Sequence, residues 1–290
     1  MDREPRASRI IRHASALGCW EMAFTPPHPR LQGLVDVYIG YDERSTSFTR
    51  RHELPGIQAV LIVNLGDPIT ITDTAGHVVP VGSGCGFAAG LSDAYAISES
   101  RGSQRGVQIM FTPEGAQRFF RLPMHLLANR VFPLDDLLGQ DATRLIGQLQ
   151  DAEDWAACFA LLDVAILQRL GEPDAAARGI AWALRQLTAS RGRLPVGALA
   201  TELGYSRKHL AGLFREHVGL PPKTVARLLR FRQVLDLVDA ADSVNWSGIA
   251  QEAGYFDQAH FSRDFRIITG CTPTEYMARR LPGQAGLPVG

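Results

Sequence analysis

The sequence repeats one helical unit in its C-terminal third, and this repeat constrains the fold more than any other feature. The first copy begins at residue 199 and reads LATELGYSRKHLAGLFREHVGLPP; the second begins at residue 249 and reads IAQEAGYFDQAHFSRDFRIITGCTP. Both copies contain a Gly-Tyr pair and a later Gly-x-x-Pro, although the second copy has one more residue after its Gly-Tyr pair. Self-similarity of this kind indicates two copies of one supersecondary unit.

Each copy predicts a helix, a tight turn and a second helix. Gly204 and Gly254 stand where the backbone turns, a position at which glycine adopts a left-handed conformation without strain. Ser206 and Asp257 stand where a side-chain oxygen can accept hydrogen bonds from the free amides of the next helix. This arrangement is the anatomy of a helix-turn-helix.

The second helix of each copy has an apolar face and a polar face. Apolar residues such as Leu210, Phe214, Phe261 and Phe265 recur at helical spacing and are predicted to be buried. The opposite faces carry side chains suited to a DNA major groove. The predicted DNA-binding residues are Arg207, Lys208, His209 and Arg215 in the first copy, and Gln258, His260, Ser262, Arg263 and Arg266 in the second. A single helix of this kind is more often an ordinary solvated surface, but two matched copies favour DNA binding.

With these motifs, residues 175–280 resemble the DNA-binding domain of the AraC/XylS family of transcription regulators. The resemblance implies seven helices, two helix-turn-helix units, and a long connecting helix, which here is residues 222–240. It also implies that the two recognition helices enter successive major grooves. Arg227, Arg230 and Arg232 in the connecting helix either contact phosphates or form a solvated face.

This sequence departs from the family at Ala211 and Gly212, where larger polar or basic side chains often reach bases. Alanine can at most contact a thymine methyl group, and glycine offers no side chain for reading a base. We therefore expect the first unit to position the protein on DNA, through Arg207, Lys208 and Arg215. The second unit is expected to read the sequence through Arg263, assisted by Gln258, His260 and Ser262.

Charge and composition predict two domains. The whole chain has no formal net charge, but residues 1–173 contain 15 Lys+Arg and 20 Asp+Glu, whereas the rest contains 15 and 10. A basic C-terminal part agrees with a nucleic-acid partner. The expected division is an N-terminal β-rich sensing or oligomerisation domain (1–170), a linker (171–177), the DNA-binding domain (178–282) and a tail (283–290).

The N-terminal part is predicted to be mostly β from residue 30 to residue 112, because short runs rich in Val, Ile and aromatics alternate with Gly, Asp and Pro turns. Residues 1–30 are expected to be irregular because of three nearby prolines. The expected fold class is α+β: a cupin-like barrel or sandwich with trailing helices, then an all-α domain with two helix-turn-helix units. In the trailing helix at residues 154–170, an apolar stripe of Trp155, Phe159, Leu162 and Ile166 fits core packing and a dimer contact equally well.

The N-terminal histidines give no metal-binding pattern. His28, His52 and His77 are isolated, and the four cysteines lack metal-ligand spacing, so no cofactor is expected. Side chains that a pocket in a barrel would draw on are Tyr38, His52, Gln58, Asn64, Tyr95 and Gln108. Any one of them is more often an ordinary core or surface residue.

Together these features predict a sequence-specific transcription regulator without catalytic activity. Its expected partners are double-stranded DNA, a second copy in a homodimer, a small-molecule effector, and RNA polymerase if it activates. No run is apolar enough for a membrane span or a secretion signal, so a cytoplasmic location is expected. Two alternatives stay open: a cupin-type enzyme carrying a DNA-binding tail, and a regulator whose N-terminal part only oligomerises.

Overall fold

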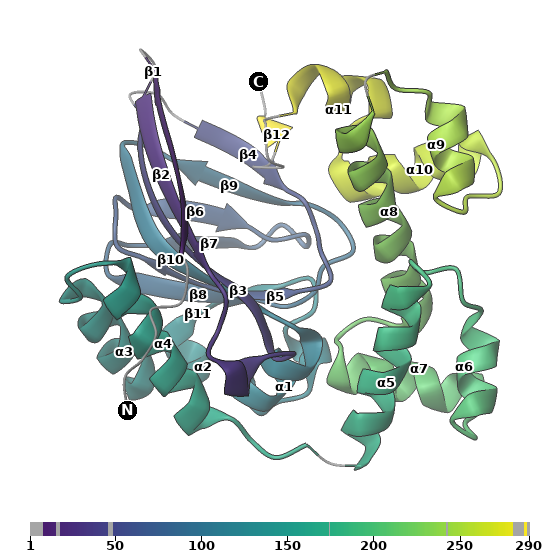
Figure 1. Ribbon diagram of the computed structural model, residues 1–290, viewed down its shortest axis with the longest axis horizontal. Helices are drawn as coiled ribbons and strands as arrows, with labels where there is room; N and C mark the ends of the chain where they lie inside the picture. Colours follow the sequence, from purple (N-terminus) through teal and green to yellow (C-terminus); the bar gives the residue numbers. More distant parts are fainter. Residues whose placement is uncertain are drawn as a thin grey trace.

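The computed structural model describes residues 8–15, 18–45, 49–173, 175–241, 243–280 and 287–288, and it has a β-rich N-terminal domain and a helical C-terminal domain. In Figure 1 the two β-sheets lie on the left and the helices of the C-terminal domain lie on the right. The expected α+β class and the two kinds of domain are therefore confirmed. The exact domain limits stay predictions, and most of the expected tail lies outside the described residues.

Antiparallel strands form two sheets in the N-terminal domain. The larger sheet has the order β1-β2-β3-β10-β5-β8-β11, and the smaller has the order β12-β4-β9-β6-β7. The strands of the larger sheet are β1 (Arg9–Ser15), β2 (Gly18–Thr25), β3 (Val35–Ser45), β10 (Ser103–Phe111), β5 (Ala59–Asn64), β8 (Cys85–Ala89) and β11 (Val131–Pro133). The strands of the smaller sheet are β12 (Leu287–Pro288), β4 (Thr49–Glu53), β9 (Ala96–Ser100), β6 (Ile69–Thr72) and β7 (Val78–Val81).

The expectation that residues 1–30 are irregular is wrong for most of the described part. β1 and β2 form an antiparallel hairpin that pairs Arg9 with Phe24, and β2 continues the sheet by pairing with β3. The prolines come directly after β2, so they end the strand and do not prevent it. An ion pair of 2.6 Å between Arg12 and Glu21 joins the two strands. Residues 1–7 lie outside the described residues.

Helices cover one face of the larger sheet: α1 (Pro113–Phe120), α2 (Leu134–Leu138), α3 (Gln140–Gln150) and α4 (Trp155–Arg169), with short 3-10 turns η1 (Pro29–Leu31) and η2 (Met124–Leu126). Trp155 of α4 lies directly over Gly40 of β3, where a Cβ atom would come within 2.4 Å of the indole. Phe159 stacks on Tyr38, whose hydroxyl donates to the Asp163 carboxylate at 2.9 Å. Part of the core of the N-terminal domain thus lies between α4 and this sheet.

These contacts account for the apolar stripe of α4. Phe159, Leu162 and Ile166 are each no more than 1% exposed, and the Trp155 indole donates to Glu21 of β2 at 2.9 Å. The stripe therefore packs against the core of its own domain. The alternative of a dimer contact is not needed to explain it.

The C-terminal domain contains seven helices within the described residues, the number that the family resemblance implies, and the connecting helix has the expected limits. They are α5 (Ala175–Ala189), α6 (Val196–Glu202), α7 (Arg207–His217), α8 (Pro222–Ala240), α9 (Trp246–Glu252), α10 (Gln258–Thr269) and α11 (Pro273–Arg279). In Figure 1, α5 to α7 lie at one end of α8, and α9 to α11 lie at the other end. Among the described helices, none is long and apolar enough to cross a membrane.

An aromatic cluster forms the core of the last three helices and joins them to α8. Phe265 of α10 is fully buried, and four rings surround it with centroids 5.4 to 5.9 Å away. These rings belong to Phe231 of α8, Trp246 of α9, Phe261 of α10 and Tyr276 of α11. One side chain therefore contacts all four helices.

Candidate nucleic-acid interface

The first helix-turn-helix consists of α6 and α7. Gly204 has a φ of +67°, and the next amide, of Tyr205, donates to the Ala200 carbonyl at 2.8 Å to close the turn. The Ser206 hydroxyl then accepts from the amide of His209 at 3.1 Å and so caps α7. The roles expected for the turn glycine and the cap are confirmed in this unit.

The second helix-turn-helix, α9 and α10, repeats this geometry. Gly254 has a φ of +81°, and Tyr255 donates its amide to the Ala250 carbonyl at 2.9 Å. Asp257 accepts from the amide of His260 at 2.7 Å. The extra residue of this copy, Phe256, lies between the turn and the cap.

Removing the second cap should weaken α10. Asp257→Ala is expected to lower the free energy of unfolding by about 0.5–2 kcal/mol, because an amide of the first helical turn loses its acceptor. Asp257→Asn is the matched control, since asparagine caps helices about as well as aspartate. Urea unfolding followed by circular dichroism measures both variants. Equal losses in the two variants would show that the charge matters and the cap does not.

The predicted DNA-binding residues of the first unit lie on the outer surface of α7. Arg207, Lys208, His209 and Arg215 are all exposed. The Arg207 guanidinium lies against Gly197 of α6, and the His209 ring packs edge-on to Tyr205 at 4.7 Å. Lys208 and Arg215 thus present their charges on the surface, whereas the turn and α6 partly hold the other two side chains.

The second unit brings its predicted residues together on α10. Gln258, Arg263 and Arg266 are exposed, and His260 and Ser262 are partly buried. His260 makes two contacts within the protein. Its ring packs edge-on against Tyr255 at 5.4 Å, and it lies 3.6 Å from the carboxylate of Asp264. Because these contacts fix the imidazole, we expect His260 to orient the start of α10 as well as to face DNA.

The connecting helix α8 sets the distance between the two units. Its 19 residues correspond to about 28 Å at 1.5 Å per residue. One turn of B-DNA separates successive major-groove sites on one face by roughly 34 Å. A helix of this length is therefore suited to holding two recognition helices about one turn of DNA apart.

The three arginines of α8, for which the sequence left open phosphate contacts or a solvated face, do not share one role. Arg227 makes a 3.3 Å ion pair with Asp93 of the N-terminal domain. Arg230 donates to the Gly192 carbonyl at 3.1 Å and lies 5.6 Å from the centre of the Tyr255 ring. Only Arg232, paired with Asp236 four residues on, forms a solvated face. The other two are structural, because both are half-buried and bound within the protein.

The N-terminal domain contacts the second unit at the end of α10. The His52 ring of β4 stacks on Tyr95 with centroids 3.9 Å apart, and its Nδ1 is 2.9 Å from the Thr269 carbonyl oxygen. Gly270, with a φ of +79°, packs against this pair so closely that a Cβ atom would come within 2.6 Å of Tyr95. Close by, Leu287 of β12 pairs with β4. His52 and Tyr95 are thus part of a contact between domains, which sequence reasoning missed.

The N-terminal domain also contacts the first unit, at the end of α7. Gly219, with a φ of +99°, lies against the Met124 carbonyl of η2, where a Cβ atom would be 3.1 Å from that oxygen. Together with the Arg227–Asp93 ion pair on α8, these contacts join the N-terminal domain to both units and to the helix between them. In both units the contact lies at the C-terminal end of the recognition helix.

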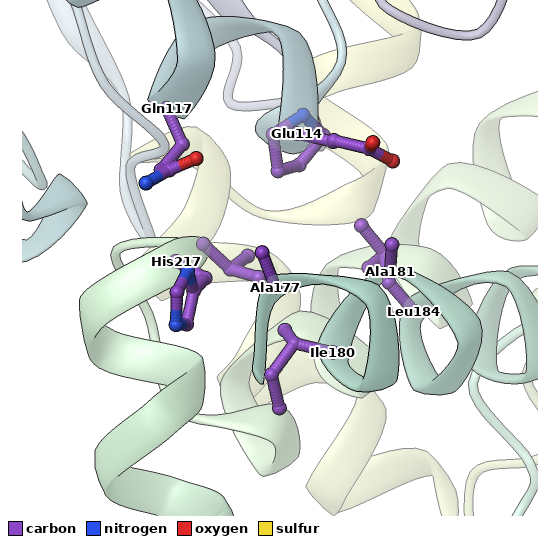
Figure 2. A pocket seen from close by; sticks show the side chains of 9 residues that line it. Glu114, Gln117, Ala177, Ile180, Ala181, Leu184 and His217 are labelled. Atoms are coloured by element: carbon purple, nitrogen blue, oxygen red, sulfur yellow. The ribbon is translucent and has the colours of Figure 1, made fainter. Parts of the chain in front are cut away.

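A hollow lies between α1 of the N-terminal domain and α5 and α7 of the C-terminal domain. Figure 2 shows Glu114 and Gln117 on one side of it, and His217 with α5 side chains on the other. The enclosed space in it is about 20 Å³, which holds about one water molecule. His217 is only 6% exposed, and its Nδ1 has no hydrogen-bond partner among the described residues. The apolar lining residues are Pro113, Ala177, Ile180, Ala181, Leu184 and Val218.

The other side chains considered for a pocket have structural roles or lie apart. Tyr38 faces α4, and the buried amide of Asn64 donates to the carbonyls of Asp67 and Gly82. Within the described ranges, no group of three or more His, Cys, Asp or Glu side chains is arranged to hold a metal ion.

Comparison with known proteins agrees with this geometry. A family model described as a helix-turn-helix domain matches residues 199–279, which contain α8, the second unit and all of the first unit except the start of α6. The C-terminal domain is an AraC-type helix-turn-helix domain. The AraC-type domain makes the chain a DNA-binding transcription regulator. A second model, described as a domain of unknown function (DUF6597), matches residues 23–133 of the β-rich domain.

Solved structures similar to this chain share little of its sequence. ToxT from Vibrio cholerae is 12% identical with a TM-score of 0.47, and the match covers 83% of this chain and 97% of ToxT. ToxT bound to an unsaturated fatty acid gives 12% and 0.45, over 84% and 94% of the two chains. A predicted oxalate decarboxylase from Thermotoga maritima gives 12% and 0.28, over 39% of this chain and 99% of that one. No curated protein matches the chain.

Proposed function

We propose that this regulator recognises its DNA site with two unequal units and that its N-terminal domain controls how the units are held. The observation that supports the proposal is the matched geometry at the two ends of α8. Each unit has the same turn and cap, and each presents basic side chains outward from its recognition helix. Selection of bound sequences from a random duplex pool with the full chain tests it. Enrichment of a site with two blocks one helical turn apart is expected.

The second unit is proposed to read bases and the first to position the protein. On α7 the outward position 212 is glycine, and a Cβ atom there would meet no other atom within 4 Å. Packing therefore does not require glycine here, and the position offers nothing to a base edge. On α10 the corresponding position is Arg263, which is exposed and can make a bidentate contact with guanine.

The N-terminal domain is proposed to preorganise the two units. Its contacts with Thr269 and Gly270 at one end, with Gly219 at the other, and with Arg227 between them bridge the DNA-binding domain. None of the contacts described involves the exposed residues of the recognition faces. Fixing two units at one separation before binding reduces the entropy lost on binding.

Releasing one of these contacts should weaken binding to the complete site. His52→Ala combined with Tyr95→Ala removes the contact with α10 without changing the DNA-binding domain. We expect about 3- to 10-fold lower affinity for a two-block site and little change for a duplex carrying only the block read by the second unit. Fluorescence anisotropy measures both. His13→Ala, an exposed histidine of β1, is the control. Tighter binding would show that the contact inhibits the regulator.

A small-molecule effector is proposed to act by separating α1 from α5 and α7 at the hollow between the domains, because the hollow as it stands holds about one water molecule. A ligand there would touch α1 of one domain and α5 and α7 of the other, so its binding would depend on how the domains are held. The buried Nδ1 of His217, which has no hydrogen-bond partner among the described residues, is the polar group that a ligand entering there would meet. Ligand-dependent thermal shifts that disappear in His217→Phe would support this site.

The proposal includes no catalytic step. The alternative, a cupin-type enzyme that carries a DNA-binding tail, predicts bound metal in the purified protein, which metal analysis measures. The proposal also includes a homodimer and a cytoplasmic location. If the regulator is an activator, it further includes a contact with RNA polymerase. Sedimentation equilibrium with and without operator DNA determines the oligomeric state.

A further inference from the structure

Phe256 is almost completely exposed, unlike every other large hydrophobic side chain in the described part of the chain. It is 93% exposed, and the next most exposed, Val78 of β7, is 62% exposed. A phenyl ring exposed to water lacks the favourable free energy that burial of its apolar surface normally gives. Phe256 is also the extra residue that distinguishes the second unit from the first.

The backbone on both sides of Phe256 is held in place. Tyr255, one residue before it, is 6% exposed and packs over the Arg230 guanidinium. Burial raises the pKa of the Tyr255 hydroxyl above its ordinary value, so this anchor stays neutral. Asp257, one residue after it, caps α10. The exposed ring is therefore fixed at the N-terminal end of the recognition helix.

We propose that Phe256 contacts DNA through an apolar surface, either a thymine methyl group or the edge of a deoxyribose. This inference rests on the proposed reading role of α10. The N-terminal residues of a recognition helix come closest to base edges, and apolar side chains contact the thymine methyl. A phenyl ring cannot neutralise a phosphate, so its contact differs in kind from those of the neighbouring arginines.

The surroundings of Phe256 favour DNA over a protein partner. A stable protein interface buries about 800 Å² on each side, whereas one aromatic side chain contributes roughly 150–250 Å². In the described part of this unit, the only other exposed large hydrophobic residue is Ile267. The polar and basic side chains of Gln258, Arg263 and Arg266 lie exposed on the same helix. A single exposed ring beside a basic helix face therefore fits a contact with duplex DNA better than a protein interface.

The salt dependence of binding distinguishes an apolar contact from a phosphate contact. Phe256→Ala is expected to lower affinity for the selected site about 10-fold at every salt concentration, because no counterion is released by a phenyl contact. Arg266→Ala is expected to reduce the slope of log K against log salt by about 1. Replacing thymine by deoxyuridine throughout the site then separates the two sources. A thymine methyl contact makes wild type, but not Phe256→Ala, sensitive to the replacement; a sugar contact makes neither sensitive.

Controls separate this inference from the proposed function. Thermal unfolding of Phe256→Ala should match wild type, and Val78→Ala should leave both stability and DNA affinity unchanged. Unchanged affinity in Phe256→Ala with impaired binding in Arg263→Ala would overturn the inference and leave the proposed function intact. Unchanged affinity in both variants would overturn both. A changed salt slope, or a loss of self-association with normal DNA binding, would also overturn the role given to Phe256.

Discussion

Replacing Arg263 with alanine is expected to lower affinity for the preferred site about 5- to 150-fold while hardly changing affinity for unrelated duplexes. A bidentate contact between arginine and guanine contributes about 1–3 kcal/mol of discrimination against other base pairs. Arg263 is exposed on α10, and the first unit has Gly212 at the corresponding position. No equivalent reader in α7 therefore compensates for its loss.

Lys208→Ala is the matched comparison, because a lysine on the first unit is expected to contact phosphate. Its removal should weaken binding to all sequences alike and reduce the salt slope by about 1. Sequencing of selected sites measures base preference, and anisotropy titrations at several salt concentrations measure the slopes. An unchanged base preference in Arg263→Ala, or a changed one in Lys208→Ala, would reverse the roles given to the two units.

Replacing Phe265 with alanine is expected to lower the free energy of unfolding by about 3–5 kcal/mol. The side chain is fully buried, and its ring contacts aromatic rings from α8, α9, α10 and α11. Alanine leaves a cavity that these rings cannot fill without leaving their rotamers. The loss is comparable to the whole stability of many domains, so the second unit should lose its fold first.

Phe265→Leu keeps most of the volume and provides a variant that remains folded. It should be destabilised by clearly less than Phe265→Ala, while Ile267→Ala, 45% exposed on the same helix, should stay within about 1 kcal/mol of wild type. Urea titrations followed by tryptophan fluorescence report on Trp246 beside the cavity. Equal stability of the alanine variant and wild type would show that the aromatic cluster is not the core of this unit.

The sequence was sufficient for the C-terminal domain because its signals are local. Gly204 and Gly254 adopt the left-handed conformation, Ser206 and Asp257 cap their helices, and Phe261 is buried. The turns and caps depend on neighbours within a few residues, the buried face follows from helical spacing, and the repeat shows every signal twice. The reading roles of the outward side chains depend on DNA, so they stay predictions.

The N-terminal domain was less predictable because its contacts are distant in sequence. The hairpin of β1 and β2 depends on pairing with β3, and the nearby prolines gave a misleading turn signal. Arg227 pairs with Asp93, 134 residues away, and His52 contacts Thr269, 217 residues away. No periodicity marks such partners. The sequence therefore predicts a phosphate contact or a solvated face for Arg227, and it offers His52 only as a candidate pocket residue.

The contact of His52 and Tyr95 with the end of α10 has a consequence for the N-terminal domain itself. Coupling between two sites is reciprocal: the factor by which the domain contact changes DNA affinity is also the factor by which DNA changes the strength of the contact. Under the proposal that this contact preorganises the two units, the operator therefore also changes the strength of the contact with the N-terminal domain. An effector that acts on the same contact would then bind a promoter-bound chain and a free chain with different affinities.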